Sequence, residues 1–286
     1  MKQIDDTLKI ESLSLSVADL DVMLNFYHDV IGMSIILKKE REVHLGVDGK
    51  TLLVLIDRGD VLPKAPHNGL YHMALLLPEE NDLLAFFYHL GSSDVSGLFQ
   101  GSADHHFSQA LYLQDPEGNG IEVYADRDKS MWSVDDTGAM PLVSLPLDIQ
   151  KLVDNFDHRL WKGLPQGTTM GHVHLSVKSL VKAQAFFVDF LGFEVMISIP
   201  SALFISKNHY HHHFGMNTWA RIAEDFRPDG ITGLVSVTLS VIDIQALIQS
   251  LPLDSIYEVI KHENSVTIKD DQGIMIHIVG AKRETK

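Results

Sequence analysis

One stretch of the chain combines residue types that hold metal ions with a tight hairpin pattern. His105, Tyr112 and Glu122 lie on or beside two strand-like runs, which the turn formers Asp-Pro-Glu-Gly-Asn-Gly at 115–120 connect. Period-two alternation places Glu122 on the same face as Tyr124. A carboxylate within an apolar strand is costly to bury unless a partner such as a metal ion compensates it. The alternative is a Glu122 that faces water from a half-exposed strand.

Composition limits which ligands and partners are possible. The 286 residues include no cysteine, so a metal site must use histidine and carboxylate side chains. The chain has 16 histidines, which cluster at 105–106 and within 209–213. The formal net charge of −15, without a basic stripe, argues against nucleic acid and anionic membranes as partners. Apolar runs are strand-sized and no signal pattern is found, so we expect a cytoplasmic protein without a membrane span.

An internal repeat organises the elements that must position these residues. The sequence Leu-Ser-Leu-Ser-Val at 13–17 returns as Val-His-Leu-Ser-Val at 173–177, at a constant offset of 160 residues. Each copy leads into an amphipathic segment with an N-cap residue before it and a glycine after it. These signals predict helices over 19–31 and 179–191.

Two weaker copies of the same unit, a strand, a helix and two or three further strands, complete the chain. We number the four units in chain order, and they cover residues 8–57, 69–126, 170–220 and 232–280. One unit cannot cover its own sheet face, so two units side by side would form one curved sheet around a cavity, with helices outside.

The linear order of the units predicts two domains. The first spans 8–126 and the second spans 170–280. The linker at 127–169 is long for a simple connection and contains a predicted helix over 148–160. A linker of this length leaves the second domain free to dock in an unusual way.

Inward positions of the strands are those where polar side chains would converge. On the first strands of units 1 to 4 we place Ser12, His72, His172 and Ser236. On the last strands we place Leu53, Glu122, His213 and His277. A histidine on an apolar strand can also be a hydrogen-bonded core residue, and the matching of positions is what favours a shared site.

With these positions, the repeated unit resembles the βαβββ module of the vicinal oxygen chelate superfamily, which includes glyoxalase I, bleomycin-resistance proteins and extradiol ring-cleaving dioxygenases. The resemblance covers nearly the whole chain except the linker and the tails. It implies an α+β fold in which four βαβββ modules form two curved, mixed, barrel-like β-sheets with helices outside. In that superfamily, metal ligands come from the two strand positions named above.

The hairpin resembles the extradiol dioxygenase pattern more specifically. That pattern has a histidine, an apolar residue with tyrosine, Asp-Pro-x-Gly and then glutamate, and here it matches His105, Tyr112, 115–118 and Glu122. Ala103 departs from the pattern, because glycine is usual there. The resemblance implies that Glu122 is a metal ligand, that Tyr112 donates to the substrate or an intermediate, and that His105 contacts the substrate.

Two histidines and one carboxylate form the ligand set of many non-haem Fe(II) oxygenases. The resemblance implies that His72, Glu122 and His172 are these ligands, with Mn(II), Zn(II) or Ni(II) as alternatives to Fe(II). Because Ser12 of unit 1 is a poor iron ligand, we predict that unit 2 pairs with unit 3, and unit 1 with unit 4. The second choice pairs units 3 and 4, around His172, His213 and His277.

The resemblance implies an extradiol dioxygenase that inserts O2 into a catechol-type diol, with an aromatic diol and O2 as partners and a homo-oligomer as a further possibility. His213 would exchange a proton with the substrate, because an imidazole titrates near neutral pH. Which of His211, His212 and His213 faces the site is left open. One alternative is a glyoxalase-like isomerase or thiol transferase that adds His213 as a fourth ligand, and another is a drug-binding protein without catalytic activity.

Overall fold

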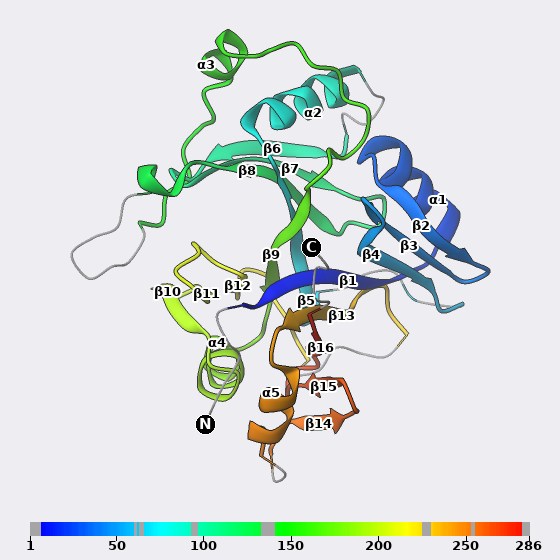
Figure 1. Cartoon of the computed structure of the whole chain (residues 1–286), viewed down its shortest axis with the longest axis vertical. Coiled ribbons are helices and arrows are strands. Elements are labelled where there is room, and N and C mark those ends of the chain that lie inside the picture. Colours follow the sequence, from blue (N-terminus) through cyan, green and yellow to red (C-terminus); the bar gives the residue numbers. More distant parts are fainter. Residues whose placement is uncertain are drawn as a thin grey trace.

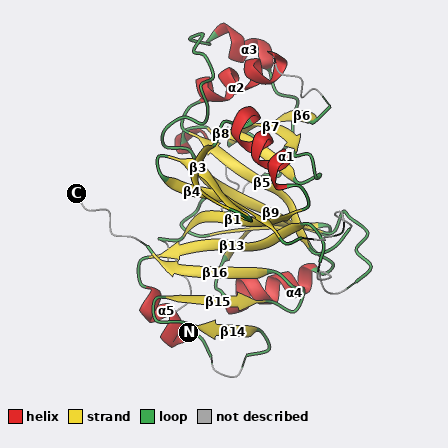
Figure 2. Ribbon diagram, turned by 90° about the vertical axis from the view of Figure 1, so that its right-hand side faces the viewer, coloured by secondary structure: helices red, strands yellow, loops and turns green. Residues whose placement is uncertain are grey.

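Strands from all four units join in one hydrogen-bonded sheet. The computed structural model describes residues 7–59, 62, 66–92, 97–132, 141–224, 230–252 and 255–281. The strand order is β14-β15-β16-β13-β1-β9-β5-β8-β7-β6; β4, β3 and β2 branch from β1, and β12, β11 and β10 branch from β9. Helices lie on the outside of the sheet (Figures 1 and 2). Among the described residues, no helix is long and apolar enough to cross a membrane.

The strands follow the four units. Unit 1 has β1 (Lys9–Val17), β2 (Ser34–Lys39), β3 (Glu42–Val47) and β4 (Lys50–Asp57). Unit 2 has β5 (Gly69–Leu77), β6 (Phe99–Asp104), β7 (Ser108–Gln114) and β8 (Gly120–Asp126). Unit 3 has β9 (Thr169–Ser176), β10 (Glu194–Ile199), β11 (Ala202–Ser206) and β12 (Phe214–Asn217). Unit 4 has β13 (Gly233–Val241), β14 (Glu258–Lys261), β15 (Ser265–Lys269) and β16 (Met275–Gly280).

The helices confirm the repeat. Units 1 and 3 contain α1 (Leu20–Asn25) and α4 (Leu180–Gln184), which continue as the π-helical turns η1 (Phe26–Val30) and η3 (Ala185–Phe190). The other helices are α2 (Glu80–Ser92), η2 (Lys129–Met131), α3 (Ile149–Asp154) and α5 (Ile244–Ser250). The side chains of Asp19 and Ser179 cap α1 and α4, and Gly32 and Gly192 follow with φ near 85°. Both predicted helices therefore form, each with a π turn.

The helix predicted over 148–160 is wrong in length, because α3 ends at Asp154. Beyond it the chain turns so that Arg159 can bind Asp82 of α2 at 2.7 Å and Asp157 at 2.6 Å. His158 has a positive φ of 59°, which no α-helix allows. The ion pair with Asp82 joins the linker to unit 2.

The predicted exchange of units is confirmed. Strand β5 of unit 2 pairs antiparallel with β9 of unit 3, and β1 of unit 1 pairs antiparallel with β13 of unit 4. A single residue pair, Ile10 with Met170, connects the two pairs of units through β1 and β9. The division into domains at 8–126 and 170–280 stays a prediction, and strand pairing crosses between these two segments.

Hairpin turns brace one pair of units against the other. Glu117, in the turn of unit 2, accepts backbone hydrogen bonds from Ala18 and Asp19 of unit 1 at 2.8 and 3.0 Å. Gln272, in the turn of unit 4, accepts one from Ser179 of unit 3 at 2.9 Å. Each turn thus contacts the N-terminal end of a helix in the preceding unit. These contacts join the pair formed by units 2 and 3 to the pair formed by units 1 and 4.

Candidate metal centre

Four neighbouring strands align a row of side chains on one face of the sheet. Tyr112 of β7 pairs with Glu122 of β8, which lies beside Ala74 of β5, and Ala74 pairs with His172 of β9. His72 precedes Ala74 by two residues and therefore shares its face. Because Ala74 has only a methyl group, it leaves room for the larger side chains on both sides.

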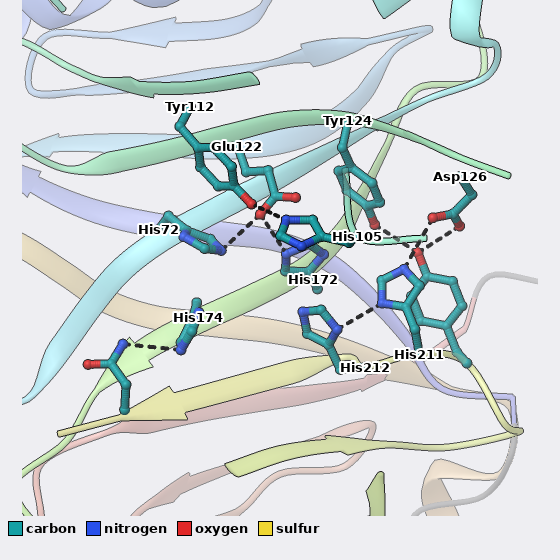
Figure 3. A network of polar contacts seen from close by, with 12 residues as sticks. His72, His105, Tyr112, Glu122, Tyr124, Asp126, His172, His174, His211 and His212 are labelled. Atoms are coloured by element: carbon teal, nitrogen blue, oxygen red, sulfur yellow. Dashed lines mark hydrogen bonds and ion pairs between the residues drawn. The ribbon is translucent and has the colours of Figure 1, made fainter. Parts of the chain in front are cut away.

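The three predicted ligands converge on one carboxylate oxygen. The Nε2 atoms of His72 and His172 each lie 3.1 Å from Oε2 of Glu122 (Figure 3). All three side chains are buried, and one ligand atom from each lies within 4.8 Å of the others. The structure therefore brings together residues from two units. Glu122 and His172 are 50 positions apart in the chain.

This donor set fits a metal ion. Adjacent ligands on an octahedral ion, with bonds of about 2.1 Å, lie about 3.0 Å apart, close to the separations seen here. The buried Nε2 of His72 also has no hydrogen-bond partner among the described residues. A buried imidazole nitrogen beside a carboxylate oxygen, without a proper hydrogen bond, is the arrangement that a shared cation would satisfy.

The protonation states also suit metal ligation. Burial alone would raise the pKa of Glu122, but His172 and His72 outweigh it and hold that pKa well below its usual value. Burial lowers the pKa of His172 to about 4, against the opposite influence of Glu122. At neutral pH the site thus offers a carboxylate and a neutral imidazole, the forms that bind metals.

Glycines make room for the site. A Cβ atom on Gly171, which precedes His172, would lie 1.8 Å from the hydroxyl oxygen of Tyr124. A Cβ on Gly120 would lie 2.3 Å from the carbonyl oxygen of Tyr71, beside His72. The backbone at both imidazoles is therefore packed too closely for any other residue type at the neighbouring positions.

His105 and Tyr112 contact each other beside the ligands. Nε2 of His105 lies 2.7 Å from the hydroxyl of Tyr112, and Nδ1 donates to the carbonyl of Val143 at 2.7 Å. The linker thus orients His105, since a carbonyl can only accept. Burial, followed by the charge of Glu122, raises the pKa of Tyr112 well above its usual value, so its hydroxyl keeps its proton.

The histidine tract contributes different residues from the one predicted. It is a loop before β12, in which Asn208 and His209 have positive φ values of 50° and 56°. The loop places the ring of His212 4.2 Å from that of His172, and the ring of His211 5.8 Å from it. His172, His211 and His212 form a second buried group that could hold a metal ion.

His213 does not occupy the predicted cavity position. Gly215 pairs with His174 as Glu122 pairs with Ala74, so Gly215 fills the position equivalent to Glu122. Nδ1 of His213 accepts a hydrogen bond from the backbone N–H of Lys207 at 3.2 Å and lies 2.9 Å from Ser206 Oγ. Burial lowers the pKa of His213 to about 3. The predicted match of His213 to the Glu122 position was wrong because the chain turns within the histidine tract and enters the strand only after it.

The second-choice site is also not formed. Within the described residues, neither group that could hold a metal includes His213 or His277. His277 pairs with Thr238 of β13, which lies next to β1 and not beside the strands of unit 3. The four-ligand arrangement that would add His213 to the triad has the same difficulty.

A network of hydrogen bonds next to the triad was not predicted. Tyr124 contacts Tyr210, hydroxyl to hydroxyl, at 2.8 Å, and Tyr210 donates to Asp126 Oδ2 at 2.9 Å. Asp126 Oδ1 lies 3.1 Å from Nε2 of His211 (Figure 3). Strand alternation could have found part of it, because Tyr124 and Asp126 follow Glu122 at steps of two on β8.

Comparison with known sequences agrees with this geometry. Residues 9–123 match the family described as the Glyoxalase/Bleomycin resistance protein/Dioxygenase superfamily. The chain is 36% identical over 277 residues to catechol-2,3-dioxygenase of Bacillus subtilis, and this match covers 94% of this chain and 96% of that protein. A shorter match, 24% identical over 115 residues, is to the metallothiol transferase FosB of Staphylococcus saprophyticus, over 40% of this chain and 75% of that protein.

Solved structures share the fold. Glyoxalase I from Zea mays superposes with a TM-score of 0.60 at 12% identity, over 96% of this chain and 92% of that one. The cppA protein of Streptococcus pneumoniae superposes with a TM-score of 0.57 at 15% identity, over 98% and 99% of the two chains. At such identities the likeness concerns the fold alone, and it confirms the expected arrangement of curved mixed sheets with outer helices.

Proposed function

Because this chain belongs to the Glyoxalase/Bleomycin resistance protein/Dioxygenase superfamily, we propose that it is an extradiol ring-cleaving dioxygenase for a catechol-type diol, with a mononuclear Fe(II) site. The observation that carries the proposal is the convergence of His72 and His172 on one oxygen of Glu122. The full-length similarity to a catechol-2,3-dioxygenase supports the same reaction class.

In this proposal His72, Glu122 and His172 hold the metal. Two imidazoles and a carboxylate are the set that non-haem Fe(II) oxygenases use, and three protein ligands leave positions free for substrate. When bound, the ion supplies the Lewis acidity and the redox chemistry that cleavage of an aromatic ring by O2 requires. Burial of all three side chains keeps bulk water away from the ligands.

The neighbouring side chains bind the diol and move its proton. Tyr112 keeps its hydroxyl proton, which Nε2 of His105 accepts in the structure and which turns to a developing oxyanion when the diol is bound. His105 fixes the orientation of Tyr112 through their 2.7 Å contact. In place of His213, His212 accepts the proton of the substrate hydroxyl, because its ring packs against that of His172.

The glyoxalase-like or thiol transferase alternative keeps one supporting observation, the partial similarity to metallothiol transferases. The alternative considered above adds His213 to the triad and so uses four protein ligands. Among the described residues the triad has no fourth partner within the same 4.8 Å group, since the second group shares only His172 with it. The three-ligand geometry therefore favours the dioxygenase.

The experiment combines elemental analysis with a colour assay. Protein purified without oxygen is expected to contain about one iron per chain, or to bind one on reconstitution. With catechol under air it should produce a yellow semialdehyde, whereas zinc-loaded protein, which lacks redox chemistry, should not. Fully iron-loaded protein that cleaves neither catechol nor substituted catechols would refute the proposal. Activation by zinc or nickel with a thiol substrate would favour the alternative.

A further inference from the structure

Asp126, at the end of β8, receives hydrogen bonds from two directions. Its Oδ2 accepts from the hydroxyl of Tyr210 at 2.9 Å, and its Oδ1 lies 3.1 Å from Nε2 of His211. The side chain of Asp126 is 21% exposed, while that of His211 is 1% exposed. Asp126 is therefore a carboxylate at the edge of a buried cluster, four residues after Glu122 on the same strand.

One direction leads to His172. A hydroxyl carries one proton, and Tyr210 donates its proton to Asp126, so Tyr124 must be the donor in the 2.8 Å contact between the two hydroxyls. The ring of Tyr124 lies 4.9 Å from that of His172, and its hydroxyl fills the space that Gly171 leaves open. Asp126 thus holds the ring that packs against a metal ligand.

The other direction leads to His212, and the direction of each hydrogen bond follows from the one before. An ionised carboxylate only accepts, so Nε2 of His211 carries a proton. In the neutral form of the His211 ring its Nδ1 is an acceptor, and it lies 2.8 Å from Nδ1 of His212. Nδ1 of His212 must then donate. Its Nε2 is left without a proton, with the lone pair that a base requires.

Packing holds the rings in this arrangement. Phe107 stacks on His211 with ring centroids 4.3 Å apart and an interplanar angle of 18°. Trp132 closes another side of His211 at 5.5 Å. In Figure 3 the ring of His212 lies below that of His172, with its second nitrogen on the side that faces His172. Because packing fixes the rings, what remains to be determined is which nitrogen of each ring carries the proton. Asp126 determines this through its hydrogen bond to His211.

We propose that Asp126 is a positioning residue for the reaction: through His211 it fixes the tautomer in which His212 presents an unprotonated Nε2, and through Tyr210 and Tyr124 it supports His172. The catalytic part of this inference rests on the proposed function. In the step it serves, the proton of the substrate hydroxyl moves to Nε2 of His212, and the hydroxyl oxygen keeps the electron pair.

The Asp126→Asn variant tests this arrangement directly. An amide has one acceptor oxygen, so it accepts from either Tyr210 or His211 and offers an N–H to the other. When that N–H points to His211, the chain reverses: Nδ1 of His211 donates to His212, and the proton of His212 moves to Nε2. Asp126→Glu keeps both acceptors, and Asp29→Asn removes the same charge from a side chain that is 69% exposed in unit 1.

The first readout is the tautomer of each histidine in metal-free protein, from nitrogen-15 NMR of histidine-labelled samples. We expect His211 protonated at Nε2 and His212 at Nδ1 in the wild-type protein and in the Asp126→Glu and Asp29→Asn variants. In Asp126→Asn we expect His212 to shift toward the Nε2-protonated form. His211→Phe, which keeps a ring against Phe107, assigns the signals.

The second readout is ring cleavage by iron-loaded protein. We expect kcat of Asp126→Asn to fall about 100-fold, with KM and iron content within twofold of wild type, and Asp126→Glu to recover most of the loss. Wild-type protein with His212 protonated at Nε2 would overturn the inference, as would unchanged tautomers in Asp126→Asn or a loss of kcat that merely follows a loss of iron. If the tautomers are as expected but no diol is cleaved, the proposed function fails and the hydrogen-bond assignment stands.

Discussion

The two paired halves of the sheet carry the same row of positions with different side chains. In units 2 and 3 the row across four strands is Tyr112, Glu122, Ala74 and His172. In units 1 and 4 the row in the same register is Thr267, His277, Thr238 and Ser12. The repeat therefore builds the row twice, and among the described residues only the first row includes side chains that could hold a metal ion together.

The halves also differ in how their rows are covered. The linker carbonyl of Val143 accepts a hydrogen bond from His105, and the histidine loop of unit 3 packs against His172. Glu122 in the first row is 3% exposed. In the second row His277 is partly exposed and contacts the hydroxyl of Thr267 at 2.9 Å. A metal centre thus needs the ligands and also the neighbouring segments that exclude water from them.

The hairpin turns differ in a similar way. Asp115 Oδ2 accepts from the hydroxyl of Tyr27 and from the side chain of Asn119, both at 2.8 Å. At the equivalent positions of units 3 and 4 stand Phe187 and Ile274, which offer no side-chain donor, and Asp270 Oδ2 has no hydrogen-bond partner among the described residues. Burial therefore raises the pKa of Asp270 to about 6.

The largest effect is expected from removing the carboxylate of the first row. Glu122→Ala should abolish stoichiometric metal binding and lower ring cleavage by at least about 1,000-fold, because two imidazoles alone hold the ion weakly. Metal content by elemental analysis and product formation measure this. His277→Ala, the same change in the second row, should leave both within twofold. A Glu122→Ala protein that retains one metal ion per chain would contradict the ligand assignment.

A smaller effect is expected from adding a side chain at Gly171, which precedes His172. Gly171→Ala would place a Cβ 1.8 Å from the hydroxyl of Tyr124, which must move and release His172. We expect a loss of about 2 kcal/mol in the free energy of unfolding and weaker metal binding. Gly91→Ala, in α2 with nothing within 4 Å of its Cβ, should be neutral or slightly stabilising. Equal stability of the two variants in denaturant titrations would remove the packing argument.

The last prediction concerns the turn of unit 4, where the effect on stability depends on pH. The folded-state pKa of Asp270 is about 6 and its usual value is 3.8, so the folded protein retains a proton that the unfolded chain has lost between these pH values. This carboxyl therefore reduces stability as pH rises through that window, by up to about 3 kcal/mol. Asp270→Asn should remove the dependence.

The measurement is the difference in unfolding free energy between Asp270→Asn and wild type from pH 4 to 7.5. Taking the difference removes the pH-dependent contributions of the other carboxylates, which both proteins share. We expect this difference to move in favour of the variant as pH rises. Asp115→Asn is the matched comparison, and it should destabilise the protein at every pH because its amide cannot accept from both Tyr27 and Asn119. A difference for Asp270→Asn that does not change with pH would show that burial does not perturb this group.

Local patterns explain why much of the site was predictable. The turn formers at 115–120 and the alternation after them determine the hairpin, so Tyr112 and Glu122 had to lie side by side. The constant 160-residue offset equated His172 with Ser12, and the poor ligand at Ser12 predicted the pairing of units 2 and 3. In this case ligand chemistry indicated topology, since units 2 and 3 together supply two imidazoles and a carboxylate, whereas units 1 and 2 supply one imidazole and a carboxylate.

The failures have non-local or conformational causes. The helix predicted over 148–160 stops early because Arg159 binds Asp82, 77 residues away in the chain. His213 was misplaced because two residues with left-handed backbone conformations, Asn208 and His209, change the alignment of the tract with the strand. Neither feature produces a periodic signal in the sequence.

By itself, the sequence determined the repeat, the hairpin and the three candidate ligands, because strand alternation and turn chemistry act over a few residues. Tertiary structure decided which histidine of the tract faces His172, and it made Asp126 the point where two hydrogen-bonded chains meet. Those outcomes depend on contacts between units 2 and 3, and such contacts are set by how whole strands pack and not by the order of neighbouring residues.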